Sequence, residues 1–203
     1  MTEATLARHS TERISRLRVP DESELTDEVR AFFAESRARQ GYVLNYFRAH
    51  ALNSENLARF NAYLLPFLDP SRGRLPYAER ELIATVVSAA NRCAYCHLNH
   101  VRSLGAAIGD KARAQLIALD YRHVADLSER ERALADLATK ITEDPRSVGE
   151  ADFERLRGLG LDDQDILEAI EIAAIFNATN RISIALGVVP DKEFFEKGGS
   201  YGD

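Results

Sequence analysis

The spacing of apolar residues is the feature that most limits what this chain can fold into. Apolar side chains recur three and four positions apart in nearly every segment, whereas alternating polar and apolar runs are scarce. A repeat near 3.6 residues places apolar side chains on one face of an α-helix, and a half-buried strand would need a repeat of two. The sequence therefore predicts an all-α protein built as a helical bundle.

Glycine, proline and capping residues set the expected helix boundaries. Two pairs, Ser128 with Glu131 and Ser147 with Glu150, have the spacing of a capping box, in which side chains satisfy free amides of the first turn. Each pair predicts a helix start. Together with the glycine and proline breaks, the pattern predicts helices over 22–39, 45–52, 55–68, 77–90, 95–107, 111–119, 129–143, 151–159 and 163–186.

The helical segments are expected to form one domain. The 203 residues, 45% of them hydrophobic, can bury a core, because a chain of this size hides about 70% of its unfolded surface. We expect a polar N-terminal arm over 1–20, a single all-α domain over 21–191 and a glycine-rich C-terminal tail over 192–203. Phe194 and Phe195 lie past the last predicted core helix, which favours a docked tail or an interface.

Charge and hydropathy exclude two classes of partner. The formal net charge of -6 and the pI near 5.5 argue against nucleic acid, because phosphate binding relies on clustered Lys and Arg. The first twenty residues lack the apolar run of a signal peptide. The sequence also has no run of about 18 apolar residues, the length that a membrane-spanning helix needs. We therefore expect a soluble, cytoplasmic protein.

The only two cysteines, Cys93 and Cys96, form a C-x-x-C pair. Two cysteines are too few for the disulfide framework of a secreted protein. In a reducing compartment a clustered pair is typical of redox chemistry or metal binding.

The residues on either side of the pair suggest a helical hairpin. On one straight helix Glu81 and Cys93 would lie about 18 Å apart and could not cooperate. A reversal near Asn91-Arg92, where Asn can take the left-handed conformation that ends helices, would bring Glu81 level with His100. The dipeptide Asn180-Arg181 follows a similar apolar run, so a duplicated helical hairpin is a further hypothesis.

The hairpin would assemble a thiol site. Cys96 and His100 are four residues apart and share a helix face, so imidazole can reach thiol. Cys93 and Cys96 are close enough to form a disulfide. Helix amides and a protonated His favour the reactive thiolate, and a carboxylate such as Glu81 would orient the imidazole. The spacing leaves open which cysteine attacks first, because Cys93 is nearer the helix start and Cys96 is nearer the base.

The order Glu81, eleven residues, Cys93-x-x-Cys96 and x-x-x-His100 resembles the signature of the alkylhydroperoxidase-D-like branch of the carboxymuconolactone decarboxylase superfamily. The resemblance extends over about 13–191. It implies an all-α bundle with its redox core at about 76–107, trimers or hexamers, and no cofactor or bound metal.

The resemblance also implies a mechanism. The chain would be a peroxidase that reduces alkyl or hydrogen peroxides, with Cys96 as the peroxidatic thiol and Cys93 as the resolving thiol. His100 and Glu81 would relay protons, and a dithiol donor, such as a lipoyl-bearing protein, would reopen the disulfide. Tyr95 stands where better-characterised members carry His, which matches a subgroup described as peroxidase-related.

The residues around the cysteine pair also allow other interpretations. Tyr95 and His97 are expected to line the site by position, but Cys96-His97 also completes C-x-x-C-H, the attachment signature of c-type haem. The two cysteines with His97 and His100 could instead bind zinc. A thiol–disulfide oxidoreductase without peroxide turnover and a thiol- or metal-binding helical oligomer are the alternative functions. Glu81 could be an ordinary solvated acid in a first helical turn.

Overall fold

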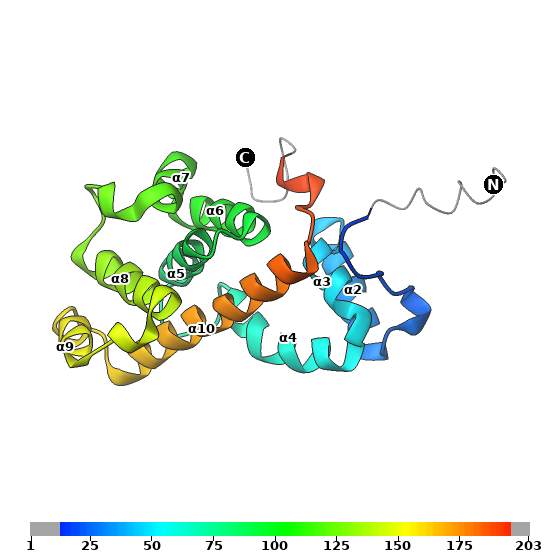
Figure 1. Ribbon diagram of the computed structural model, residues 1–203, viewed down its shortest axis with the longest axis horizontal. Coiled ribbons are helices and arrows are strands. Elements are labelled where there is room, and N and C mark those ends of the chain that lie inside the picture. The colour runs from blue at the N-terminus through cyan, green and yellow to red at the C-terminus, as the bar shows by residue number, and fades with distance from the viewer. Residues whose placement is uncertain (1–12, 196–203) are drawn as a thin grey trace.

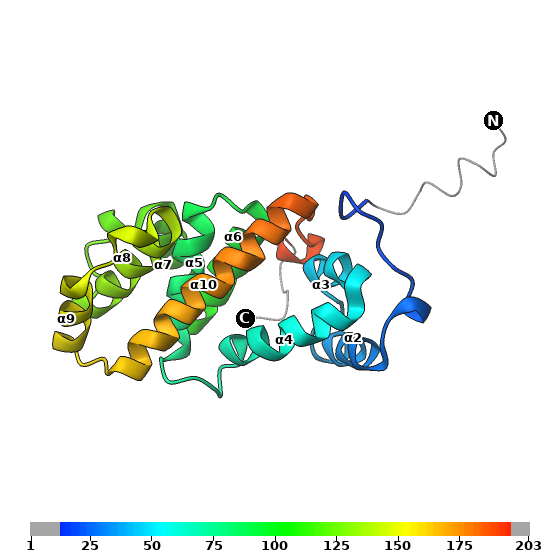
Figure 2. The same ribbon diagram turned by 60° about the horizontal axis from the view of Figure 1, so that its bottom comes forward.

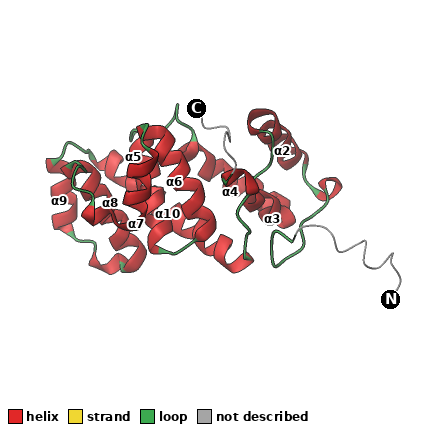
Figure 3. Ribbon diagram, turned by 90° about the horizontal axis from the view of Figure 1, so that it is seen from above, coloured by secondary structure: helices red, strands yellow, loops and turns green. Residues whose placement is uncertain are grey.

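In the computed structural model, which describes residues 13–195, every regular element of that range is helical (Figure 3). This confirms the predicted all-α class. The α-helices are α2 (Asp27–Gln40), α3 (Asn45–His50), α4 (Ser54–Leu68), α5 (Tyr77–Ala90), α6 (Ala94–Ile108), α7 (Lys111–Asp120), α8 (Glu129–Glu143), α9 (Glu150–Gly158) and α10 (Asp163–Leu186). Short 3-10 turns are η2 (Glu22–Glu24), η3 (Ala51–Asn53), η4 (Tyr121–His123), η5 (Pro145–Ser147) and η6 (Lys192–Phe194).

One predicted capping box is confirmed and the other is wrong. Ser128 N–H donates to Glu131 Oε2 at 2.8 Å, and Glu131 N–H donates to Ser128 Oγ at 3.2 Å, which fixes the start of α8. Ser147 instead ends η5. The start of α9 lies two residues later, where Asp152 accepts the Gly149 N–H at 2.9 Å.

The first expected helix, over 22–39, is two elements. Leu25 takes an extended conformation after η2. Thr26 then caps α2, because its side chain accepts the Val29 N–H at 3.4 Å. A polar capping residue inside an apolar-periodic segment therefore breaks the helix earlier than the periodicity alone indicates.

Helix α5 lies at the centre of the larger part of the fold. It packs against α6, α8 and α10, and the long α10 crosses the group α5–α9 toward α2–α4 at the other end (Figures 1 and 2). A continuous run of α5 is buried, from Arg80 to Ser88. Polar side chains on this helix are therefore inside the protein and need internal partners.

Helix α10 is the one helix of the described range with the length and composition to cross a membrane. Half of its most apolar stretch is buried inside the protein. A central core helix has the same character, so the resemblance to a membrane span is weak.

A buried arginine closes the carbonyl end of α4. Arg80 donates to the backbone oxygens of Phe67 at 2.8 Å, Asp69 at 3.0 Å and Leu75 at 3.1 Å. These donors satisfy carbonyl groups that the helix end and the following loop leave free. Arg80 therefore fixes the entry angle of α5, and with it the position of the neighbouring Glu81.

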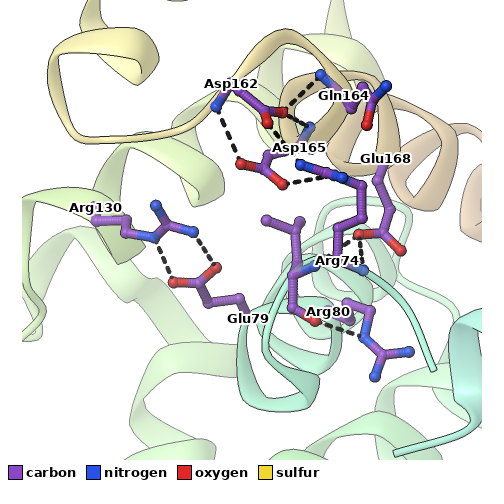
Figure 4. A network of polar contacts seen from close by, with 9 residues as sticks. Arg74, Glu79, Arg80, Arg130, Asp162, Gln164, Asp165 and Glu168 are labelled. Carbon is purple, nitrogen blue, oxygen red and sulfur yellow. Dashed lines mark hydrogen bonds and ion pairs between the residues drawn. The ribbon is translucent and has the colours of Figure 1, made fainter. Parts of the chain in front are cut away.

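Helix α10 holds the same loop from the other side. Glu168 accepts the N–H groups of Arg74 at 2.8 Å and Leu75 at 2.7 Å (Figure 4). The Arg74 side chain reaches Asp162 at 2.6 Å and Asp165 at 2.9 Å at the start of α10. The loop between α4 and α5 is thus tied to α10 by charged hydrogen bonds.

Gly73 in this loop should not tolerate a side chain. Its φ is +86°, and a Cβ would lie 2.8 Å from Glu168 Oε1 and 3.0 Å from Arg80 Cζ. We expect Gly73→Ala to lower the free energy of unfolding by about 1–3 kcal/mol. The matched control is Gly158→Ala at the end of α9, where nothing lies within 4 Å and a gain of about 0.4–1 kcal/mol is expected. Denaturant unfolding of both variants measures this, and equal effects would contradict it.

Part of the expected N-terminal arm is packed against the domain. Ile14 and Ser15 are buried, Arg16 N–H donates to Leu186 O at 2.7 Å, and Val189 N–H donates to Ile14 O at 3.0 Å. The predicted boundary at residue 20 is therefore too late. The expected tail begins with η6, and residues 1–12 and 196–203 lie outside the described residues.

Candidate active site

The predicted hairpin forms, but with a different residue at its turn. Asn91 keeps a helical φ of -74°, and Arg92 takes the left-handed conformation with φ 54°. Arg92 N–H donates to Ala89 O at 3.0 Å and Cys93 N–H donates to Ser88 O at 3.1 Å. These are the two bonds of a Schellman motif. The motif ends α5 and delivers Cys93 directly to the start of α6.

The hypothesised second hairpin is not formed. Helix α10 runs through Asn180-Arg181 without a reversal and ends at Gly187, whose φ is +61°. Asn180 is nevertheless buried, and its side-chain amide donates to Ser88 Oγ of α5 at 3.3 Å. The two segments therefore share the Asn-Arg dipeptide but not the turn.

Cys93 and Cys96 form a close, reduced pair at the start of α6. Their Sγ atoms lie 3.0 Å apart, and both thiols are free. Cys93 is the N-cap of α6, and its Sγ accepts the Cys96 N–H at 3.4 Å. Cys96 Sγ also lies 3.5 Å from Ser183 Oγ of α10, its hydrogen-bond partner. The pair is buried, with 1% and 5% of the residues exposed.

The contacts distribute negative charge unequally between the two sulfurs. The hydrogen bond with the Cys96 thiol lowers the pKa of Cys93 to about 7, with the Cys96 backbone N–H and the charge of His100 helping against burial. The hydrogen bond with Cys93, burial and the neighbouring negative charge raise the pKa of Cys96. The first proton therefore leaves the pair near neutral pH, with Cys93 holding the charge.

Titration should show this asymmetry. The reactive thiolate is absent well below a pH of about 7 and forms as the pH rises through it. Cys96→Ala removes the thiol that hydrogen-bonds Cys93, so the thiolate should then appear at higher pH. Ultraviolet absorbance of the thiolate, followed against pH in both proteins, measures the shift. An unchanged midpoint in Cys96→Ala would show that the pair is not coupled.

Glu81 and His100 meet inside the hairpin. Glu81 Oε2 lies 2.9 Å from His100 Nδ1, and the two residues are 2% and 4% exposed. The Phe176 ring of α10 stands edge-on against the imidazole at 4.5 Å. The reading of Glu81 as a solvated first-turn acid is therefore wrong. A carboxylate at Nδ1 favours the tautomer that carries its proton there and leaves Nε2 as the exchangeable nitrogen.

The expected direct contact between imidazole and thiol is missing. Within the described residues, His100 makes no hydrogen bond to Cys96, whose partners are Cys93 and Ser183. His100 lies four residues after Cys96 along α6, a backbone rise of about 6 Å. His100 nevertheless acts on the sulfurs through its charge, because it helps to lower the pKa of Cys93.

Tyr95, between the two cysteines, binds the segment that follows α10. Its hydroxyl donates to Asp191 Oδ2 at 2.7 Å and accepts the Tyr46 N–H at 3.3 Å. Asp191 Oδ1 accepts the Asn45 N–H at 2.9 Å. The Phe194 ring packs on Tyr95 at 5.5 Å. One of the two aromatic residues expected in a docked tail is thus docked, whereas Phe195 is 67% exposed.

Tyr95→Phe should destabilise the protein. The change removes the partner of Asp191 Oδ2 and of the Tyr46 N–H, and an unsatisfied buried polar group costs about 1–3 kcal/mol. Thermal or denaturant unfolding should show a loss in this range. Tyr63→Phe on α4, where Tyr63 is 47% exposed, should stay within about 0.5 kcal/mol of the parent. Equal losses in both variants would contradict a buried anchor at Tyr95.

His97, the other residue expected to line the site, has no hydrogen-bonded role in it. It is partly buried, burial lowers its pKa, and its side chain makes no hydrogen bond to another described residue. No group of three or more His, Cys, Asp or Glu side chains within residues 13–195 is arranged to hold a metal ion.

Sequence reasoning missed the contributions of α10 and the segment after it. Ser183 contacts Cys96, Phe176 contacts His100, and Asp191 contacts Tyr95. The available signal was weak: polar Asn180 and Ser183 lie three residues apart in the predicted helix over 163–186. This spacing places both on one helix face.

Comparisons with known proteins match the chain to a sequence family and to solved structures. The sequence model of the carboxymuconolactone decarboxylase family matches residues 55–119. The structure is similar to an alkylhydroperoxidase AhpD core, an uncharacterized peroxidase-related protein from Ralstonia eutropha JMP134. The identity is 35%, the match covers 91% of this chain and 96% of that chain, and the TM-score is 0.84.

Two further structures and one negative result complete the comparison. An uncharacterized peroxidase-related protein from Silicibacter sp. TM1040 is 33% identical over 92% of this chain and 96% of that one, with a TM-score of 0.84. The debrominase Bmp8 shares only the fold, at 16% identity over 88% of this chain and 92% of that one, with a TM-score of 0.70. No curated protein sequence matches the chain.

Proposed function

Because the chain belongs to the alkylhydroperoxidase-D-like branch of the carboxymuconolactone decarboxylase superfamily, we propose that it is a thiol peroxidase. Its proposed substrates are hydroperoxides, and its redox centre is the pair Cys93 and Cys96. The observation that carries the proposal is the placement of this reduced pair, with Sγ atoms 3.0 Å apart, on the same helix as a buried imidazole bonded to a carboxylate.

The proposed cycle begins with a shared proton. One thiolate and one thiol lie in hydrogen-bond contact, so the pair titrates as a unit, and proton transfer between the sulfurs can place the charge on either. Cys96, the sulfur that the family resemblance favours, attacks the outer peroxide oxygen. The O–O bond breaks, Cys96 becomes a sulfenic acid, and the leaving alkoxide takes a proton to become an alcohol.

His100 is the proposed proton donor and acceptor for these steps. Glu81 holds Nδ1, stabilises the protonated ring and leaves Nε2 to exchange protons with the reacting groups. Since no direct bond joins the imidazole to Cys96, the transfer must pass through the substrate, a solvent molecule or the other thiol.

Cys93 completes the cycle. Its thiolate attacks the sulfenic sulfur, a disulfide forms, and the released hydroxide is protonated to water. A dithiol donor then supplies two electrons and reopens the bond by exchange. A dihydrolipoyl group is the donor that we propose for the cell.

Peroxide consumption tests the function. Loss of an organic hydroperoxide is followed with dihydrolipoamide or dithiothreitol as donor, in the parent and in Cys96→Ser. We expect turnover in the parent alone. Equal rates in the two proteins would remove the peroxidase proposal, and disulfide reduction without peroxide loss would instead indicate a thiol–disulfide oxidoreductase.

A further inference from the structure

A groove that reaches Glu81 has the size of a ligand pocket. It runs between α2 and α4 on one side and α5 and α6 on the other, and it encloses about 670 Å³. Ligand pockets for small organic molecules occupy about 300–1,000 Å³. Hydrogen peroxide alone would leave most of such a space unfilled.

One wall of the groove is apolar. Phe32 of α2 and Phe47 of α3 line it, and their rings meet edge to face at 4.9 Å. Leu65 and Leu68 of α4 complete this wall. The wall would bind an apolar body, because apolar surface removed from water contributes about 25 cal/mol per Å².

One buried polar side chain in the groove lacks a partner. Asn61 of α4 is 6% exposed, and its Oδ1 accepts no hydrogen bond from any described residue. The next residue, Ala62, also lines the groove. Its carbonyl loses the usual helical donor, because Pro66 has no N–H. A ligand that carries an O–H donor would satisfy an acceptor of this kind.

Charges around the groove are of both signs. Glu28 and Glu35 of α2 face the same space as Arg39, and Arg72 is paired with Asp69 at 3.2 Å. This mixture offers no excess positive charge to a carboxylate or phosphate ligand, so it favours an uncharged one.

The groove meets the proposed proton relay at Glu81. Glu81, whose carboxylate bonds His100 at 2.9 Å, lines the groove together with Asn99 and Ser103 of α6. Asn99 is three residues from Cys96 and so lies about one helical turn away on a neighbouring part of the same face. A molecule lying in the groove can therefore present one end to the relay.

We propose that this groove is the substrate-binding site for a neutral organic hydroperoxide with an apolar body. It would not favour hydrogen peroxide or a carboxylated fatty-acid hydroperoxide. The apolar body lies between α2 and α4, Asn61 accepts a hydrogen bond from the ligand, and the peroxide end lies near Glu81 and Asn99. This inference rests on the proposed function for its chemistry, but binding can be tested without turnover.

The alcohol product provides that test, since it cannot oxidise thiols. Cumyl alcohol binding is measured by calorimetry in the parent, in Ala62→Phe and in Asn61→Leu. Ala62 is exposed to the groove, so a phenyl ring there fills the space without entering the core. We expect each variant to weaken binding by about tenfold or more. Arg59→Ala, on the exposed side of the same helix, should leave binding unchanged.

Steady-state kinetics provide a second test of the proposed binding site. In Ala62→Phe the kcat/KM for cumene hydroperoxide should fall by about tenfold more than the kcat/KM for hydrogen peroxide. Arg59→Ala should keep the parent's ratio of the two values. The inference is overturned if cumyl alcohol does not bind the parent or binds Ala62→Phe equally well. Tighter binding of a hydroxylated fatty acid would overturn it too.

Two further results distinguish failure of the binding-site proposal from failure of the peroxidase proposal. A change in the oligomeric state of Ala62→Phe would assign the groove to contact between copies of the chain, against the inference. Alcohol binding that is sensitive to Ala62→Phe, in a protein without peroxide turnover, would keep the binding site and remove the peroxidase function.

Discussion

Serine in place of either cysteine abolishes catalytic turnover of hydroperoxide, with a fall of at least about 10³-fold expected for loss of a member of a catalytic unit. The two variants should fail at different steps. Cys96→Ser lacks the attacking sulfur and forms no sulfenic acid. Cys93→Ser still reacts once with peroxide, but the sulfenic acid on Cys96 accumulates because no second thiol condenses with it.

Labelling with dimedone, followed by peptide mass spectrometry, distinguishes the two variants. We expect the sulfenic-acid adduct on Cys96 in Cys93→Ser and no adduct in Cys96→Ser. Ser183→Ala is the matched control, because it removes the hydroxyl 3.5 Å from Cys96 Sγ and keeps both thiols. It should still form the disulfide. An adduct on Cys93 in Cys96→Ser would instead make Cys93 the attacking sulfur, as its lowered pKa favours.

Glu81→Gln has the second largest expected effect, a fall in kcat/KM of about 10²–10⁴-fold. The amide keeps the size of the carboxylate and can still accept the Nδ1–H of His100. It carries no charge, so the protonated imidazole loses its stabilising partner in a buried site. Proton transfer to the leaving oxygen then becomes slow, while both thiols remain free to titrate.

Steady-state kinetics over a range of pH test the role of Glu81. Glu79→Gln, on the same helix, is the matched control, because Glu79 binds Arg130 at 2.6 Å and lies outside the thiol site. We expect the control to keep the parent's kcat/KM and pH profile. If the kcat/KM of Glu81→Gln stays within about threefold of the parent's, the Glu81 carboxylate does not contribute to catalysis through His100.

Much of the fold was predictable from local pattern. The bounds of α5, α8 and α10 agree with the sequence prediction at both ends, because capping residues and glycines coincide there with the limits of the apolar repeat. The prediction placed the turn between α5 and α6 correctly but chose Asn91 for the left-handed residue. The structure uses Arg92, since the chain must reverse one residue later to make Cys93 the N-cap of α6.

The local sequence pattern could not predict contacts between segments that are far apart in the chain. Ser183 is 87 residues from Cys96, and Asp191 is 96 residues from Tyr95. Only the packing of α10 and the segment after it brings them together. Arg80 shows the same limit: a charged residue beside two acids looks solvated, yet it is buried because the carbonyl groups at the end of α4 need its donors.

A single-turnover experiment tests the central claim most directly. The reduced protein is mixed under anaerobic conditions with one equivalent of cumene hydroperoxide, and thiols, alcohol and peptide disulfides are then measured. The proposed function predicts that each chain loses both thiols, gains one disulfide between Cys93 and Cys96 and yields one equivalent of alcohol. Two thiols that still titrate after the peroxide has been given time to react would contradict it.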